Sequence, residues 1–120
     1  VLFGSCSAAV SETGKIELDK IAVVLLDIKD DIPADVEWVL RVEGHADAVP
    51  LGAACSQRFS SNLDLSAKRA VSVAEYLRSR NVPAKRLMAT GLGSEWPIAA
   101  GYSAAALAQN RRIEFKLDAR

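Results

Sequence analysis

A carboxylate, an amide and two guanidinium groups are the side chains of this sequence whose types and spacing best fit the binding of a small charged group. Asp47 lies just past the alternating segment 36–42. Asn62 and Arg69 are seven residues apart, nearly two helical turns, so both would lie on one face of a helix. Arg111 begins the last alternating segment, in phase with its inward positions, where an Arg needs a carboxylate or the rim of a pocket.

If these segments converge, one acid and two Arg side chains surround a single spot. This combination suits a zwitterion, because the acid pairs with an ammonium and an Arg fork binds a carboxylate. The spacing also allows a purely structural interpretation, in which Asp47 pairs directly with Arg69 and Arg111 binds buried carbonyl groups. From spacing alone, the structural interpretation is favoured.

Helical periodicity predicts two long helices that would position these residues. In the first, capped by Ser11 or Thr13 and ended by Pro33, apolar residues recur at intervals of three and four. Its predicted face consists of Leu18, Ile21, Leu25, Ile28 and Ile32. The second begins near Ser61, where an S-x-x-D capping pattern stands. Its predicted apolar stripe consists of Leu63, Ala67, Ala70, Ala74 and Leu77.

Alternation of apolar and polar residues predicts the strands. They cover residues 1–3, 36–42, 87–90 and 111–117, with a short helix over 104–108. The inward positions of the last strand are Ile113, Phe115 and Leu117. The resulting order, β-α-β-α-β-(α)-β, is typical of an α+β, two-layer sandwich with the helices packed on one face of a four-stranded sheet. The pattern does not decide whether that sheet is parallel or mixed.

Size and charge narrow the possible functions. A chain of 120 residues suits one domain, covering 1–120. The formal net charge of zero argues against a nucleic-acid binder and against a polybasic membrane-surface module. No apolar run reaches the roughly 20 residues of a membrane helix, and no signal peptide is visible. We expect a domain cut from a longer protein, attached to a membrane only through a missing N-terminal region.

The cysteines and the single histidine do not form a metal-binding pattern. Cys6 and Cys55 stand without a CxxC motif or a nearby pair of histidines, so neither a metal nor a cofactor is expected. We interpret the two cysteines as unpaired small hydrophobic residues, with a disulfide as the alternative in an oxidising compartment.

Four short motifs stand in a recognisable order along the chain: GHAD at 44–47, NLDLSAKRA at 62–70, RL and GLG at 86–93, and NRRIE at 110–114. In this order they resemble the OmpA-like domain shared by outer-membrane protein A, peptidoglycan-associated lipoprotein and the flagellar stator protein MotB. The similarity spans the whole chain. It implies a periplasmic domain that binds peptidoglycan without covalent chemistry and anchors an exported or membrane-tethered protein to the cell wall.

The resemblance also implies roles for individual residues. Asp47 and Arg69 match the family residues that hold the ammonium and the carboxylate of diaminopimelate in the peptide stem. Asn62 and Arg111 match residues that line the same pocket. The sequence departs from the family pattern at Ala46, where relatives carry threonine, and at Val49, where they often carry a polar residue. The ligand-contacting residue of the first loop, 4–7, is not identified.

Two other functions compete with this interpretation. A hydrolase could use His45, Asp47 and Ser66, but Ser66 lies within a predicted helix and not on the strained elbow of α/β-hydrolase nucleophiles. We therefore expect no enzymatic activity. The second is a dimerisation or protein-interaction module, as in stator relatives, with Trp96 as an exposed anchor. For Trp96 we favour a ring folded over the local core.

Overall fold

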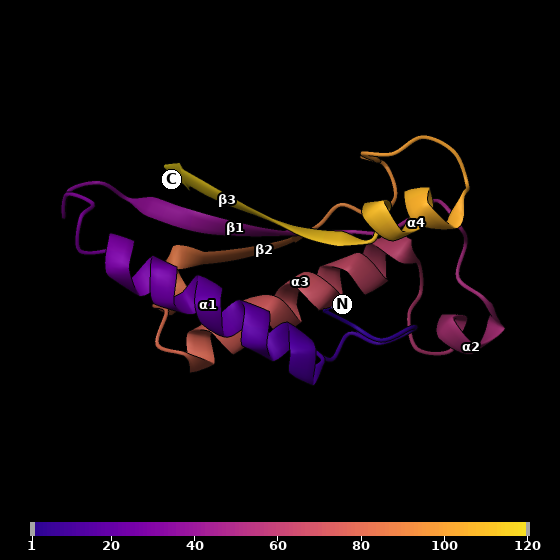
Figure 1. Ribbon diagram of the computed structural model, residues 1–120, viewed down its shortest axis with the longest axis horizontal. Coiled ribbons are helices and arrows are strands. Elements are labelled where there is room, and N and C mark those ends of the chain that lie inside the picture. The colour runs from indigo at the N-terminus through magenta and orange to yellow at the C-terminus, as the bar shows by residue number, and fades with distance from the viewer. Residues whose placement is uncertain (1, 120) are drawn as a thin grey trace.

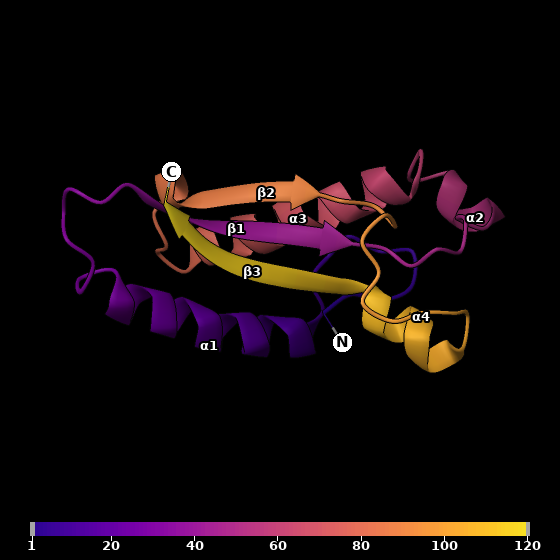
Figure 2. The same cartoon turned by 90° about the horizontal axis from the view of Figure 1, so that it is seen from above.

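A mixed three-stranded sheet with two long helices on one face forms most of the computed structural model, which describes residues 2–119 (Figure 1). The strands are β1 (Trp38–His45), β2 (Leu87–Gly91) and β3 (Arg112–Ala119). Figure 2 shows β1 between the other two, parallel to β2 and antiparallel to β3. The parallel pair connects through the second long helix, and the antiparallel strand closes the other edge.

The long helices begin at capped positions, as their sequences predict. Helix α1 (Glu12–Ile28) begins where Ser11 Oγ accepts a hydrogen bond from the Gly14 N–H at 3.0 Å. Helix α3 (Asn62–Ser79) begins where Ser61 Oγ accepts one from the Asp64 N–H at 3.0 Å. These side chains satisfy backbone donors that the first turn of a helix leaves without partners.

Three short helical elements complete the fold. They are α2 (Ala53–Ser56), the 3-10 turn η1 (Ala84–Arg86) and α4 (Ala104–Asn110). In Figures 1 and 2, α2 and α4 both lie at the end of the molecule where β1 ends and α3 begins. Ser103 caps α4, because its Oγ accepts a hydrogen bond from the Ala106 N–H at 3.1 Å.

The core lies between the inner face of the sheet and the two long helices. Leu18 of α1, Val42 of β1 and Leu77 of α3 have no exposed surface. Full burial of such a side chain stabilises a protein by about 1.5–3 kcal/mol. The other buried members of this cluster are Ala22, Leu25, Leu40, Ala70, Val73 and Val82.

Helix α3 lies against the sheet at unusually short distance near its beginning. Gly44 of β1 and Gly91 of β2 are register partners on adjacent strands. A Cβ atom on Gly44 would lie 2.1 Å from the carbonyl oxygen of Ser66, and one on Gly91 would lie 2.6 Å from the Cα of Ala67. Only glycine allows backbone to meet backbone in this way. The contact fixes the start of α3 next to the end of β1.

The predicted fourth strand is wrong. Val1 lies outside the described residues, and Phe3 forms only an isolated bridge with Val10. The Leu2 carbonyl accepts a hydrogen bond from the Ser11 N–H at 2.8 Å. Segment 2–10 therefore pairs with itself at the entrance to α1, and the sheet has three strands in the described part of the chain.

Three predicted core positions are also wrong. Helix α1 ends at Ile28, so Ile32 lies in the following turn. Leu63 is 56% exposed, because the first turns of α3 bury Leu65 and Ser66 instead. Leu117 is 52% exposed near the free end of β3. The prediction for α3 is confirmed at Ala70 and Leu77, which are fully buried, and it is wrong at the start of the helix.

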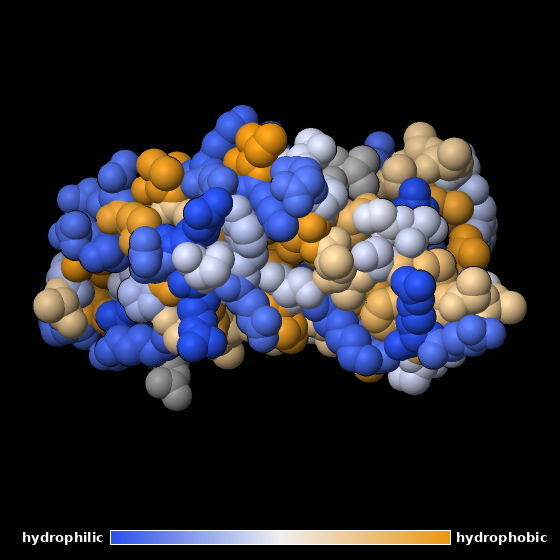
Figure 3. All heavy atoms as spheres, turned by 90° about the horizontal axis from the view of Figure 1, so that it is seen from below, coloured by the Kyte–Doolittle hydropathy of each residue, from blue (hydrophilic) through white to orange (hydrophobic). Residues whose placement is uncertain are grey.

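The two ends of the molecule differ at the surface as well. In Figure 3, seen from the helix side, hydrophilic residues cover most of the surface over the long helices, while weakly hydrophobic residues gather toward the α2 end. The chain is elongated, with extents of 47 × 26 × 24 Å. No helix among residues 2–119 combines the length and the apolar character that crossing a bilayer requires.

Candidate ligand-binding site

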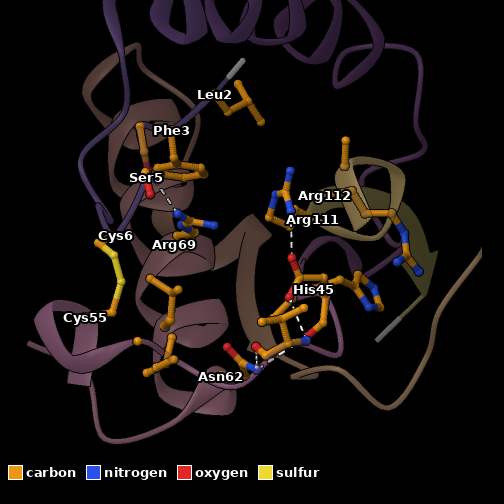
Figure 4. Close-up of a pocket in the computed structure, with 18 of the residues that line it drawn as sticks. Leu2, Phe3, Ser5, Cys6, His45, Cys55, Asn62, Arg69, Arg111 and Arg112 are labelled. Atoms are coloured by element: carbon orange, nitrogen blue, oxygen red, sulfur yellow. Dashed lines mark hydrogen bonds and ion pairs between the residues drawn. A yellow bond between two sulfur atoms is a disulfide. The ribbon is translucent and has the colours of Figure 1, made fainter. Parts of the chain in front are cut away.

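A cavity of about 720 Å³ opens where β1 ends and α3 begins. Its walls come from segment 2–6, the loop 45–52, α2, the beginning of α3 and the beginning of β3. Figure 4 shows side chains from these separate segments pointing toward one space. All four residues predicted to bind a ligand line it: Asp47, Asn62, Arg69 and Arg111.

Asp47 pairs with Arg111. The Arg111 Nη1 donates to Asp47 Oδ2 at 2.6 Å, and the Val49 N–H donates to Asp47 Oδ1 at 3.0 Å. The Asp47 side chain is only 12% exposed, whereas that of Arg111 is 46% exposed. A short charge-assisted bond thus holds the carboxylate at the cavity wall, while the Arg111 side chain stays partly accessible.

Arg69 is held by backbone carbonyl groups. Its Nε donates to the Ser7 carbonyl at 2.8 Å, and its Nη2 donates to the Gly4 carbonyl at 3.1 Å. The guanidinium also lies 5.1 Å from the centre of the Phe3 ring. Burial lowers the pKa of Arg69, the nearby charge of Arg111 lowers it further, and Asp47 acts in the opposite direction. Arginine nevertheless remains charged in proteins.

Asp47 and Arg69 therefore do not pair directly, as the structural interpretation of the sequence would require. Figure 4 shows Arg69 and Arg111 on facing sides of the cavity. Asp47, Arg69 and Arg111 together carry a formal excess of one positive charge. Arg112 also lines the cavity, but it is paired with Glu114. Such a site favours a ligand that has a carboxylate, with an ammonium positioned toward Asp47.

Asn62 shapes the wall of the cavity. Its Nδ2 donates to the Val49 carbonyl at 2.9 Å and to the Asp47 carbonyl at 3.3 Å. As the first residue of α3, it ties the loop that leaves β1 to the start of the helix. The amide predicted to line the pocket thus also fixes the backbone that carries Asp47.

Ser66, which the hydrolase alternative would use, is 1% exposed and does not line the cavity. Its Oγ donates to the Leu63 carbonyl at 2.9 Å and accepts from the Gly93 N–H at 3.0 Å. Ser66 therefore holds the loop after β2 against α3, and its buried hydroxyl is not available as a nucleophile.

The two cysteines form a disulfide, so their interpretation as unpaired hydrophobic residues is wrong. Cys6 and Cys55 are bonded, with their Cα atoms 5.3 Å apart, and both line the cavity. They are separated by 49 residues in the sequence. Nothing in the spacing reveals this proximity, because it results from how segment 2–10 folds back over the start of α3.

The only group of described residues that could hold a metal ion lies on the outer face of the sheet. It consists of Glu43, His45 and Glu114, whose ligand atoms lie within 4.8 Å of one another. Lys116 lies 3.3 Å from Glu43, and the Arg112 Nε donates to Glu114. These cations already occupy the carboxylates and would repel a divalent ion, so the cluster is an ion network.

Trp96 lies on the surface and not over the local core, contrary to the favoured interpretation. It is 66% exposed in the loop between β2 and α4. The Trp96 carbonyl accepts a hydrogen bond from the Arg112 Nη2 at 2.9 Å, so the backbone of this loop is fixed while the ring faces solvent.

Comparisons with known proteins identify the family. The OmpA family model matches residues 2–111, and the chain belongs to this family. Peptidoglycan-binding protein ArfA of Mycobacterium tuberculosis is 37% identical over 90 residues, covering 69% of this chain and 28% of ArfA. The Escherichia coli protein named "Probable lipoprotein YiaD" is 33% identical over 117 residues, covering 98% of this chain and 47% of YiaD.

The fold is also found in solved structures. A MotB-like protein from Desulfovibrio vulgaris superposes with a TM-score of 0.85 at 29% identity, covering all of this chain and 71% of that one. The match covers less than half of the length of each curated relative, ArfA and YiaD. The family is a non-enzymatic one, which confirms that the chain is not an enzyme.

Proposed function

We propose that this chain binds peptidoglycan without covalent chemistry, through the diaminopimelate of the peptide stem. The observation that carries the proposal is the meeting of Asp47, Arg69 and Arg111 around one accessible cavity. Diaminopimelate in a stem presents an ammonium and a carboxylate at one side-chain end. This charge pattern complements one acid and two guanidinium groups.

The free pocket is already organised for this ligand. A carboxylate can accept about four hydrogen bonds, so Asp47 keeps capacity for an ammonium beside Arg111 and the Val49 N–H. Arg69 uses Nε and Nη2 on backbone carbonyls and retains Nη1 for the ligand carboxylate. Each charged hydrogen bond contributes about 1.5–3 kcal/mol net. A few of them support useful, reversible binding.

The relatives support a role in anchoring. ArfA carries peptidoglycan binding in its name, and YiaD is named as a lipoprotein. A disulfide forms in oxidising compartments outside the cytoplasm. We infer that the chain acts as one domain, 1–120, in the periplasm. In this role, the domain anchors a membrane protein to the cell wall, and that protein is itself attached to the inner or the outer membrane.

Two apolar side chains make the pocket differ from the family pattern. Ala46 is 7% exposed and removes the family hydroxyl, while Val49 is 43% exposed at the rim. Both line the cavity. The affinity therefore depends more heavily on the charged groups.

The test is co-sedimentation of the chain with purified peptidoglycan. Asp47→Ala and Arg69→Ala each remove one charged contact, so each should lower the bound fraction at least about tenfold while the chain stays folded. Arg80→Ala is the matched control, because Arg80 pairs with Asp19 at the far end of α3. Unchanged binding in both pocket variants would reject this site.

A second measurement tests the ligand. A tripeptide ending in diaminopimelate should bind at least about tenfold more tightly than one ending in lysine, which has the ammonium but lacks the side-chain carboxylate. Equal affinities measured by calorimetry would exclude diaminopimelate as the recognised group, even if peptidoglycan still binds.

Dimerisation is a second candidate function, because the loop between β2 and α4 exposes apolar side chains together. Trp96, Ile98 and Tyr102 are 66%, 61% and 74% exposed. Exposed aromatic residues of this kind are common interface anchors. Light scattering over a range of concentrations separates a monomer from a dimer.

A further inference from the structure

The Cys6–Cys55 disulfide joins two walls of the cavity that have few other connections. Cys6 lies in the N-terminal segment, and Cys55 belongs to α2. Figure 4 shows the bond at the side of the cavity next to Arg69 and Ser5. No member of the buried core cluster is a cysteine, so the bond lies outside the packing that holds the long helices to the sheet.

The hydrogen bonds of helix α2 are local among the described residues. Among the described residues, the hydrogen bonds of 53–56 all have partners within 52–59: the Ser56 N–H donates to the Gly52 carbonyl, and the Phe59 N–H donates to the Cys55 carbonyl. Before α2, the flanking tether is the Asn62 bond to Val49. After α2, Phe59 is buried with its ring 5.6 Å from the Lys68 Nζ, and the Ser60 N–H donates to Asp64. The disulfide is the one covalent link between α2 and the opposite wall.

The other partner of the bond lies in the turn that holds Arg69. The Ser7 N–H donates to the Gly4 carbonyl at 3.2 Å and closes a turn over Ser5 and Cys6. The carbonyls of Gly4 and Ser7 are the two acceptors of the Arg69 guanidinium. Cys6 has a φ of 54°, a left-handed conformation that is unfavourable for residues other than glycine.

We propose that the Cys6–Cys55 disulfide positions Arg69 for ligand binding by holding the strained turn 4–7 in place, so that the affinity of the pocket depends on the redox state of the bond. This inference rests on the proposed function. Reduction adds one hydrogen to each sulfur, with the two electrons supplied by a thiol or phosphine reductant, and frees both walls. Cys6 can then leave its left-handed conformation, and the two carbonyls turn away from Arg69.

The experiment compares the oxidised and the reduced chain. Calorimetry with the diaminopimelate tripeptide should show roughly tenfold weaker binding after reduction with a phosphine, because a preorganised contact is lost. Reoxidation should restore the affinity. Cys6→Ser/Cys55→Ser should bind like the reduced chain and should not respond to the reductant, which controls for effects of the reductant itself.

A variant at Arg69 separates positioning from general stabilisation. Arg69→Lys keeps the charge but cannot bind both carbonyls as a fork. Reduction should therefore weaken its binding less than about twofold, against roughly tenfold in the unmodified chain. A uniform loss in both proteins, or unfolding of the reduced chain in circular dichroism, would show a structural role only and overturn the inference.

These outcomes are distinct from failure of the proposed function. If the oxidised chain does not bind the tripeptide at all, the proposed function itself is wrong. If it binds, and Asp47→Ala abolishes binding, but reduction leaves the affinity unchanged, only the role of the disulfide is rejected.

Discussion

The two ends of this molecule are stabilised by different interactions. At one end, apolar side chains from α1, α3 and the sheet form a closed core in which Leu18, Val42 and Leu77 are fully buried. At the other end, the cavity walls are held by charged hydrogen bonds, backbone carbonyls and one disulfide. The first end holds most of the apolar burial that stabilises the fold, and the second holds the cavity that we propose as the binding site.

If the cavity is the binding site, as we propose, this division predicts that stability and recognition are largely separable in this fold. The link between the two ends is the short contact of α3 with the sheet at Gly44 and Gly91. This contact fixes the position of the cavity wall relative to the core. Substitutions in the core should change the free energy of unfolding, and substitutions around the cavity should change ligand affinity. Substitutions at the link should change both.

The largest effect is expected at the link. Gly44→Ala would place a Cβ 2.1 Å from the Ser66 carbonyl oxygen, which belongs to the backbone and cannot rotate away. The helix must move, so the free energy of unfolding in urea should fall by about 3 kcal/mol or more.

Gly52→Ala is the matched control for this substitution, because a Cβ there meets no atom within 4 Å. As Gly52 is the N-cap of α2, the change should alter the free energy of unfolding by no more than about 1 kcal/mol. Equal losses in the two variants would contradict the idea that a close backbone contact joins the two ends.

An intermediate effect is expected at Asn62, on the cavity side of the link. Asn62→Ala removes the donors to the Val49 and Asp47 carbonyls. The free energy of unfolding should fall by about 1 kcal/mol, since the freed carbonyls lie partly in water. Affinity for the diaminopimelate tripeptide should fall roughly tenfold, because the loop carrying Asp47 is no longer fixed.

Ser79→Ala, at the other end of the same helix, provides the control for Asn62. Among residues 2–119, Ser79 Oγ has its hydrogen bond within α3, to the Tyr76 carbonyl at 2.5 Å. This variant should have unchanged affinity. A loss of affinity equal to that of Asn62→Ala would show that binding follows helix stability and not the geometry of the loop.

The same division explains what the sequence could predict. The core end follows from local rules: Ser11 and Ser61 cap the long helices, and alternation marks β1 and β3. Such signals are contained in a few neighbouring residues. The errors there, at Leu63 and Leu117, are errors of phase or of element ends.

The cavity end depends on contacts between distant segments. Charge type and family resemblance were enough to select Asp47, Asn62, Arg69 and Arg111 as residues that gather together. Their actual partners were not predictable, because Arg111 pairs with Asp47 across 64 residues and Arg69 binds carbonyls 62 and 65 residues away. Backbone carbonyls carry no sequence signal, and the disulfide joins residues 49 positions apart.

The smallest effect is expected at His45, which lies between the two ends at the last position of β1. It is 4% exposed, and neither ring nitrogen has a hydrogen-bond partner among the described residues. Burial lowers the pKa of His45, and the charge of Arg112 lowers it further. Lys116 acts in the same direction as Arg112, whereas Glu43 and Glu114 oppose the shift.

This lowered pKa makes stability depend on pH with a definite sign. Below the ordinary histidine value of about 6.5, the unfolded chain binds a proton that the native chain resists. The free energy of unfolding should therefore fall as the pH drops from about 7 through the lowered native pKa. His45→Gln, which cannot titrate, should flatten this slope between about pH 7 and about pH 5.

Urea unfolding at several pH values within this window provides the measurement. Glu114, whose pKa is lowered mainly by the hydrogen bond from Arg112, contributes stability that is lost only as the pH falls below the ordinary value of 4.5. Its titration therefore lies outside the window. If His45→Gln retained the full slope, the buried ring would not be the titrating group. Another group would then account for the pH dependence of the free energy of unfolding.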